Sequence, residues 1–220
     1  LGTATLRRAI GARPLVHVSS LSAREPQLST YGWSKLVGEQ IARGAAGPVT
    51  ILRPPAVYGP GDREFLKLMK IASTGFVPFP SNSIAAMIYG PDLAEALVAL
   101  AEDLAGPATS AGHSFEIDDG TGGYTPAEVA TAIGGALGRT VRPVPIPPAL
   151  LRLAAVADTG LARLKGALPR LTQDRAGYMA HRDWSADSAP LRALGIWKPA
   201  TRLAEGMAAT AIAYRAQGLL

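Results

Sequence analysis

The sequence predicts an α/β protein whose strands run parallel in one sheet. Residues 15–20 and 49–52 are short apolar runs that lead into polar loops, which is typical of strands buried on both faces. Between them, Ser29 and Thr30 can cap a helix over about residues 31–43. A right-handed crossover joins such a strand–helix–strand unit, so we expect both strands in the same sheet.

The rest of the chain continues this alternation. Thr125, Pro126 and Glu128 form a capping-box pattern, and Gly138 is placed to end the helix that follows. Residues 53–62 are rich in Pro and Gly, so they are predicted to form a shaped loop without regular structure. Further strands are expected at 87–89, 113–117 and 141–146, and further helices at 64–74, 91–104, 149–168 and 202–217.

Composition excludes several classes of protein. The chain has 220 residues, of which 48% are apolar and 18% charged, which permits a sizeable core and argues against disorder. The net charge of +5 comes from scattered Lys and Arg, without a basic run interleaved with aromatic residues, so no nucleic-acid partner is expected. That charge either suits a phosphorylated ligand or simply reflects an Arg-rich chain. The absence of Cys excludes disulfides and Cys-bound metals, and isolated His residues predict no metal site.

Membrane association is also not expected. The first residues do not resemble a secretion signal, and no apolar run reaches the roughly 18–20 residues that span a bilayer. Residues 149–168 are predicted to form an amphipathic helix that packs against its own domain rather than on a membrane. We therefore expect a cytoplasmic protein.

The motif Tyr-Gly-Trp-Ser-Lys at residues 31–35 carries the predicted chemistry. Tyr31 and Lys35 are four residues apart and so share one helical face. A phenol ordinarily has a pKa of about 10, and a neighbouring cation favours its ionised form. Such a pair can exchange a proton near neutral pH, and Ser20 at the end of the first strand could hydrogen-bond a substrate oxygen. The spacing alone also fits an ordinary surface helix, but strands that end in Ser-Ser and Arg-Pro-Pro on either side favour a site.

Several ordered motifs together resemble the extended short-chain dehydrogenase/reductase family of NAD-dependent epimerases and dehydratases. They cover nearly the whole chain and lie at 16–20, 31–39, 52–61, 89–96, 194–199 and 203–206. The resemblance implies a doubly wound, Rossmann-like nucleotide-binding domain and a small α/β substrate domain. Residues 1–62 would form the C-terminal half of the nucleotide-binding domain. Residues 63–220 would mainly bind substrate, with about 84–117 returning to the main sheet.

The resemblance also implies a function and a set of site residues. It implies NAD or NADP as cofactor, with dehydrogenase, reductase, epimerase or dehydratase chemistry on a small molecule such as a nucleotide-sugar, a sterol or a hydroxyketone. Tyr31 would be the acid/base, Lys35 would bind the cofactor ribose, and Ser20 would orient the substrate. Tyr31 and Lys35 would contact the cofactor together with a loop formed by Pro55, Ala56 and Val57. A homodimer is left open, as are substrate identity and the choice between NAD and NADP.

Two departures from the family pattern qualify these expectations. The family's Gly-rich turn does not occur at the start of this sequence, so we expect the chain to be either a fragment of a longer protein or a truncated product, and on its own to bind cofactor poorly and be inactive. Only ten residues separate Ser20 from Tyr31, a short segment that also occurs in non-catalytic accessory subunits of this fold. A nucleotide-binding or structural subunit without turnover is therefore the alternative.

Overall fold

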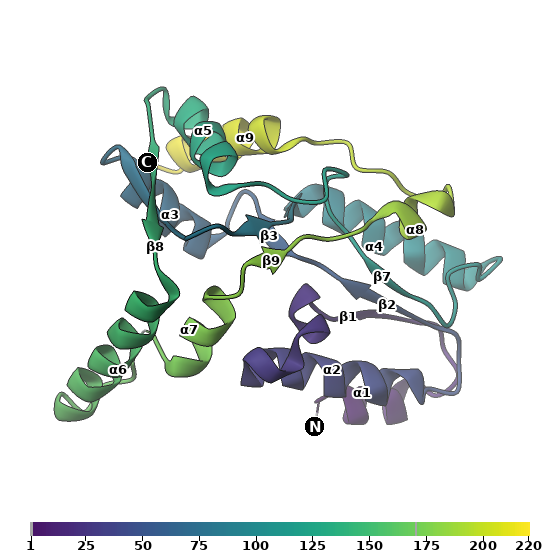
Figure 1. Cartoon of the computed structure of the whole chain (residues 1–220). Helices are drawn as coiled ribbons and strands as arrows, with labels where there is room; N and C mark the ends of the chain where they lie inside the picture. Colours follow the sequence, from purple (N-terminus) through teal and green to yellow (C-terminus); the bar gives the residue numbers. More distant parts are fainter. Residues whose placement is uncertain (1, 170) are drawn as a thin grey trace.

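Three parallel strands form the sheet that organises the fold (Figure 1). They are β1 (Leu15–Val18), β2 (Val49–Arg53) and β7 (Ser114–Glu116), in the order β1-β2-β7. The register pairs Leu15 with Val49 and Ile51 with Ser114. In this computed structural model, which describes residues 2–169 and 171–220, the predicted parallel α/β fold is confirmed.

Helices cover both faces of this sheet. Helix α2 (Thr30–Arg43) packs on β1 and β2, with α1 (Gly2–Ile10) beside it, and α4 (Gly90–Ala105) contacts the same two strands from the other face. The expected cap of α2 is confirmed, since the Ser29 hydroxyl accepts a hydrogen bond of 3.0 Å from the amide of Gly32. The sheet with helices on both faces is the doubly wound arrangement that the sequence predicted.

The prediction of an irregular loop over 53–62 is wrong in part. Residues 56–58 form β3 (Ala56–Tyr58), which pairs in parallel with β6 (Met87–Tyr89). Pro54 and Pro55 lack backbone amide donors but lie before the strand, so they do not interrupt its ladder. Gly61, with φ of +89°, adopts a backbone conformation in the turn beyond β3 that other residues rarely reach.

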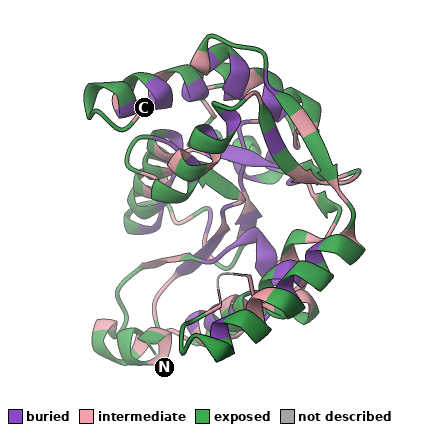
Figure 2. Ribbon diagram, turned by 90° about the vertical axis from the view of Figure 1, so that its left-hand side faces the viewer, coloured by how far each residue is buried: buried purple, intermediate pink, exposed green. Residues whose placement is uncertain are grey.

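A second layer of elements packs against β3 and has a hydrophobic core of its own. Its core contains Tyr58, Met69, Ile133 and Met207, and Tyr58 packs so closely on Gly206 that any side chain there would overlap its ring. Figure 2 shows this buried layer beside the central sheet. The elements are α3 (Arg63–Ala72), β4 (Phe76–Pro80), α5 (Pro126–Leu137), β8 (Arg142–Ile146) and α9 (Leu203–Ala216).

The expected ends of α5 are confirmed. The Thr125 hydroxyl accepts from the amide of Glu128, the Glu128 carboxylate accepts from the amide of Thr125 at 2.7 Å, and Gly138 is left-handed with φ of +70°.

Several short elements escaped sequence prediction, since two to seven residues are too few to show a period. These are η1 (Leu21–Arg24), η2 (Pro26–Leu28), β5 (Ile84–Ala85), α7 (Gln173–Met179), β9 (Asp183–Trp184) and α8 (Ala189–Ala193). The predicted amphipathic helix is α6 (Pro148–Leu164), which packs one face on α7. No helix among the described residues is long and apolar enough to cross a bilayer. The division of the chain at residue 62 stays a prediction.

Candidate active site

Helix α2 places Tyr31, Lys35 and Glu39 at intervals of four residues along one side. Tyr31, in the first turn, is 50% exposed, Lys35 is half-buried, and Glu39 is 1% exposed. The Lys35 Nζ atom lies 5.6 Å from the centre of the Tyr31 ring, so the predicted pairing of phenol and ammonium is present. Within residues 2–169 and 171–220 Lys35 makes no salt bridge, which leaves its ammonium donors for another partner.

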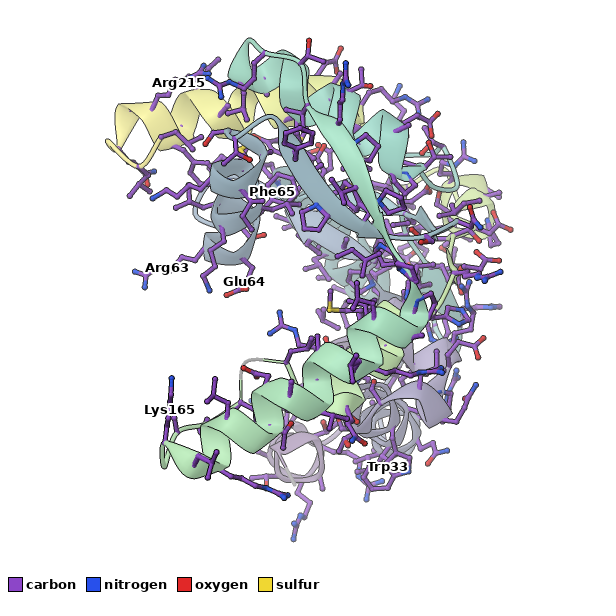
Figure 3. All side chains as sticks on the ribbon, turned by 60° about the vertical axis from the view of Figure 1, so that its left-hand side comes forward. Trp33, Arg63, Glu64, Phe65, Lys165 and Arg215 are labelled. Carbon is purple, nitrogen blue, oxygen red and sulfur yellow. The ribbon has the colours of Figure 1, made fainter. Side chains whose placement is uncertain are left out.

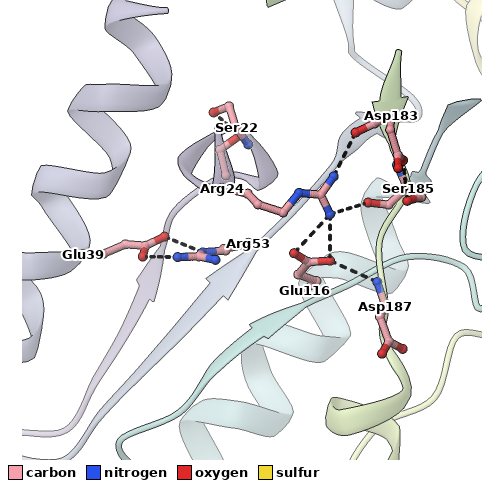
Figure 4. A network of polar contacts seen from close by, with 9 residues as sticks. Ser22, Arg24, Glu39, Arg53, Glu116, Asp183, Ser185 and Asp187 are labelled. Carbon is pink, nitrogen blue, oxygen red and sulfur yellow. Dashed lines mark hydrogen bonds and ion pairs between the residues drawn. The ribbon is translucent and has the colours of Figure 1, made fainter. Parts of the chain in front are cut away.

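The buried end of α2 is fixed to the sheet by an ion pair (Figure 4). Arg53, the last residue of β2, donates from Nε and Nη2 to the two oxygens of Glu39 at 2.8 and 2.7 Å. Ser19 donates to the same carboxylate at 2.6 Å. Burial opposes ionisation of Glu39, but the hydrogen bonds from Arg53 and Ser19 prevail and hold its pKa below the ordinary value. Arg53 therefore has a structural role here.

Ser20 lies where the first strand ends, at the carboxyl edge of the sheet. It is buried, and its hydroxyl oxygen accepts from the amide and the hydroxyl of Ser22 at 3.2 and 2.9 Å, which caps η1. A serine hydroxyl has one O–H donor besides its acceptor sites. Among the described residues, the O–H of Ser20 donates to no partner. Ser20 can therefore still donate a hydrogen bond to a ligand, although its oxygen already accepts two hydrogen bonds from Ser22.

A cavity of about 300 Å³ lies beside the start of β3. One side, which we call the sheet wall, is formed by Leu21, Pro55 and Ala56. Another part of the lining, which we call the outer wall, is formed by Tyr178, Met179, His181 and Trp184. Phe79, Pro80 and residues 83–86 complete the lining. Of the three predicted loop residues, Pro55 and Ala56 line the cavity and Val57 is exposed outside it.

The first turn of α2, which carries Tyr31, lies against α7, the helix that supplies Tyr178 and Met179 to the outer wall. Burial raises the pKa of Tyr178. The proximity of the two helices follows from the anchoring of α7, because Asp174 accepts from both the amide and the hydroxyl of Thr30 at 2.5 and 2.8 Å. The structure thus brings the predicted acid/base close to a cavity whose outer wall the sequence did not identify.

The outer wall is aromatic and is fixed by backbone hydrogen bonds. The rings of Tyr178 and His181 lie 4.7 and 4.8 Å from the ring of Trp184. Figure 4 shows Arg24 donating to the carbonyls of Asp183 and Ser185, each at 2.9 Å. Glu116, at the end of β7, contacts the same guanidinium at 3.4 Å. A single arginine therefore joins η1, β7 and the chain around β9.

Several other polar and aromatic residues near these elements have structural surroundings. His17 packs against Gly38 of α2, where a side chain would lie 3.3 Å from its Nε2 atom, and burial lowers the pKa of its imidazole. Trp33 is 58% exposed and points away from the molecule in Figure 3, outside the cavity lining. Asp118 and Asp119 are buried after β7, where Asp119 accepts from Tyr124 at 2.5 Å. The described residues contain no group of three side chains placed to ligate a metal.

Larger hollows also occur on the described part of the molecule. One of about 740 Å³ lies between α5 and α9, and one of about 570 Å³ lies between β8 and the start of α5 and shares Pro80, Ser83 and Ile84 with the smaller cavity. Ser20, Tyr31 and Lys35 line none of these three cavities, and of the predicted site residues only Pro55 and Ala56 do, in the smaller one.

Comparison with solved structures identifies the fold. The structure of MoeE5 in complex with UDP-glucuronic acid and NAD matches with a TM-score of 0.69 and 19% identity, over 98% of this chain and 70% of that one. UDP-glucuronic acid 4-epimerase from Bacillus cereus, in complex with UDP-glucuronic acid and NAD, matches with a TM-score of 0.68 and 19% identity, over 98% and 66%. At such identities the likeness establishes the fold alone, which is Rossmann-like.

A curated protein matches at higher identity. The ceramide reductase of Caulobacter vibrioides is 36% identical over 217 residues, which cover 97% of this chain and 65% of the reductase. The chain therefore spans just under two thirds of the length of that relative. No protein-family model matches the sequence.

Proposed function

We propose that this protein belongs to the extended short-chain dehydrogenase/reductase family and acts as an NAD(P)-dependent oxidoreductase or epimerase/dehydratase. The substrate would be a small molecule with a hydroxyl or carbonyl group, and the relation to the ceramide reductase favours reduction of a ceramide-type lipid. The observation that carries the proposal is the Tyr31–Lys35 pair, with Nζ 5.6 Å from the ring centre, beside a cavity lined by Pro55 and Ala56.

The residues present fit the nicotinamide end of such a cofactor. Lys35 has donors that no salt bridge among the described residues uses, which suits the hydroxyls of a ribose. Pro55 and Ala56 offer an apolar surface at the cavity, which suits one face of a planar ring. When bound, the cofactor would supply or accept the hydride.

The chain's own residues would manage the proton. The Tyr31 hydroxyl would give its proton to the substrate oxygen during reduction, or take it during oxidation, and the positive charge of Lys35 would stabilise the phenolate left behind. Ser20 would donate its free O–H to the same substrate oxygen and orient it. The aromatic outer wall would exclude water from the reacting carbon.

Replacement of Tyr31 by Phe tests this role. We expect Tyr31→Phe, made in the complete protein, to lower kcat by at least about 100-fold, the usual contribution of a general acid/base, and to leave stability nearly unchanged because the side chain is half exposed. The assay would follow oxidation of NADH and NADPH with ceramide-type ketones, nucleotide-sugars and hydroxyketones. Trp33→Phe, on the same helix but outside the cavity, is the control that should keep its rate. Equal turnover by Tyr31→Phe and the unaltered protein would refute the assignment.

The alternative is a nucleotide-binding subunit without turnover. Its support is the engagement of the Ser20 hydroxyl with Ser22 in the short segment before α2. It predicts cofactor binding by fluorescence titration together with no hydride transfer on any of these substrates, whereas the enzyme predicts both.

A further inference from the structure

Helix α6 carries an apolar stripe that packs against nothing in the described structure. Leu150, Leu153, Ala157, Leu161 and Leu164 follow one another at spacings of three, four, four and three residues, so they form one continuous helical face. All five are exposed, and Leu164 is 87% exposed. Leu168, just beyond the helix, is 91% exposed, which is more than any other large apolar side chain among the described residues.

This stripe is distinct from the face that α6 uses for packing. Leu151, Ala155 and Ala162 are buried, and the first two form a small core with Ala176 of α7. The sequence-based expectation that α6 packs on its own domain is therefore confirmed for this face. The exposed leucines of the stripe lie outside this buried face of α6. A run of exposed leucines along a whole helix marks an interaction surface.

The charges around the stripe favour an anionic partner. Arg152 and Arg163 are eleven residues apart, about three helical turns, so they lie on one flank of the helix, and both are exposed. Lys165 follows the last turn and is exposed at the far end of α6 in Figure 3. The one acidic residue of the helix, Asp158, is half-buried and accepts from the amide of Leu171 at 2.8 Å.

We propose that α6 docks on the surface of an anionic lipid bilayer, with its leucine stripe among the acyl chains and Arg152, Arg163 and Lys165 at the headgroups. An amphipathic helix with leucines on one face and basic residues beside them binds membranes by both attractions together. A second copy of this chain is a poorer occupant, because the one acidic residue of α6, Asp158, already accepts from the amide of Leu171, so a paired α6 would offer little to neutralise Arg152 and Arg163.

The location of α6 gives this docking a consequence for the site. Its inner face packs on α7, and α7 supplies Tyr178 and Met179 to the outer wall of the cavity. In Figure 1 the two helices lie together at the edge of the molecule. A bilayer bound at α6 would therefore lie one helix away from the outer wall.

Vesicle flotation with the full chain tests the proposal without reference to turnover. The probes are vesicles of phosphatidylcholine alone and of phosphatidylcholine with phosphatidylglycerol. We expect binding to the anionic vesicles that weakens with salt, and a loss of at least about tenfold in partition coefficient for Leu153→Glu combined with Leu164→Glu. The matched control is Val98→Glu combined with Ile212→Glu, which adds the same charge at exposed apolar side chains of α4 and α9 and should bind as before.

A second variant keeps the test independent of any folding defect. Arg152→Gln combined with Arg163→Gln should lose affinity for the anionic vesicles by several-fold and leave circular dichroism and Tm unchanged. Failure of the unaltered chain to float with anionic vesicles would overturn the proposal, as would equal flotation by the leucine variant. A dimer in sedimentation analysis that the leucine variant dissociates, with no flotation, would assign the stripe to a second copy instead.

Discussion

The two walls of the cavity are held in place by different kinds of interaction. The sheet wall follows from parallel strands and from the buried Arg53–Glu39 pair, which joins β2 to the helix that carries Tyr31. The outer wall depends on the two-residue pairing of β5 with β9 and on side chains such as Arg24 that bind backbone carbonyls. The proposed reacting groups thus lie on the firmly built side, and the side that would meet the variable part of a substrate is attached by few contacts. Such a division lets one fold serve many substrates.

Removal of the Glu39 charge should give the largest loss of stability. Glu39→Gln cannot neutralise the guanidinium of Arg53, whose side chain is 21% exposed, so an incompletely solvated charge is left without its partner. We expect the free energy of unfolding to fall by about 3 kcal/mol in urea denaturation. Glu64→Gln breaks an ion pair between side chains that are each 67% exposed, and it should leave the free energy of unfolding nearly unchanged. Equal losses would mean that the buried pair does not hold α2 to the sheet.

The same pair predicts how stability depends on pH. Since the pKa of Glu39 is lower in the folded chain than in the unfolded chain, its stabilising contribution is complete above the unfolded value of about 4.3 and disappears as the pH falls through the folded value. Stability curves measured between neutral pH and about pH 3 should therefore fall less steeply for Glu39→Gln than for the unaltered chain. Parallel curves would show that other carboxylates account for the acid sensitivity.

The two walls also differ in how far the sequence predicted them. The apolar runs at residues 15–20 and 49–52 predicted the parallel strands, and the pairing of Tyr31 with Lys35 follows from helical spacing alone. The predicted burial is correct for β2, whose first four residues are buried, but wrong for β1, which is half-buried and ends in the exposed Val18. The outer wall comes from α7 and β9, which are seven and two residues long, and it reaches the site through contacts such as Thr30 with Asp174, separated by 144 positions. No local pattern encodes contacts of that kind. β3 was missed because its prolines precede the strand rather than interrupt it.

Loss of Arg24 should affect the outer wall with a smaller effect on stability. Its side chain is 30% exposed, so Arg24→Gln should lower the free energy of unfolding by only about 1 kcal/mol. Because the guanidinium fixes the carbonyls of Asp183 and Ser185 beside Trp184, substrate binding should weaken more than the chemical step. In steady-state kinetics we expect KM to rise several-fold with kcat nearly unchanged. A fall in kcat with constant KM would instead connect Arg24 to the proton-transfer side.

The smallest expected effect concerns the contact between the two walls at the start of α2. Asp174 of α7 accepts from the amide and hydroxyl of Thr30, so its charge also lies at the positive end of the helix that carries Tyr31. Asp174→Asn keeps an acceptor oxygen but removes the charge, and it should cost less than about 1 kcal/mol, seen as a small fall in Tm. Hydrogen exchange offers the sharper measurement, since the first amides of α2 and those of α7 should exchange faster together while β1 and β2 stay protected. Faster exchange in α7 alone would show that α2 keeps its position without this contact, and that Ser29 suffices as its cap.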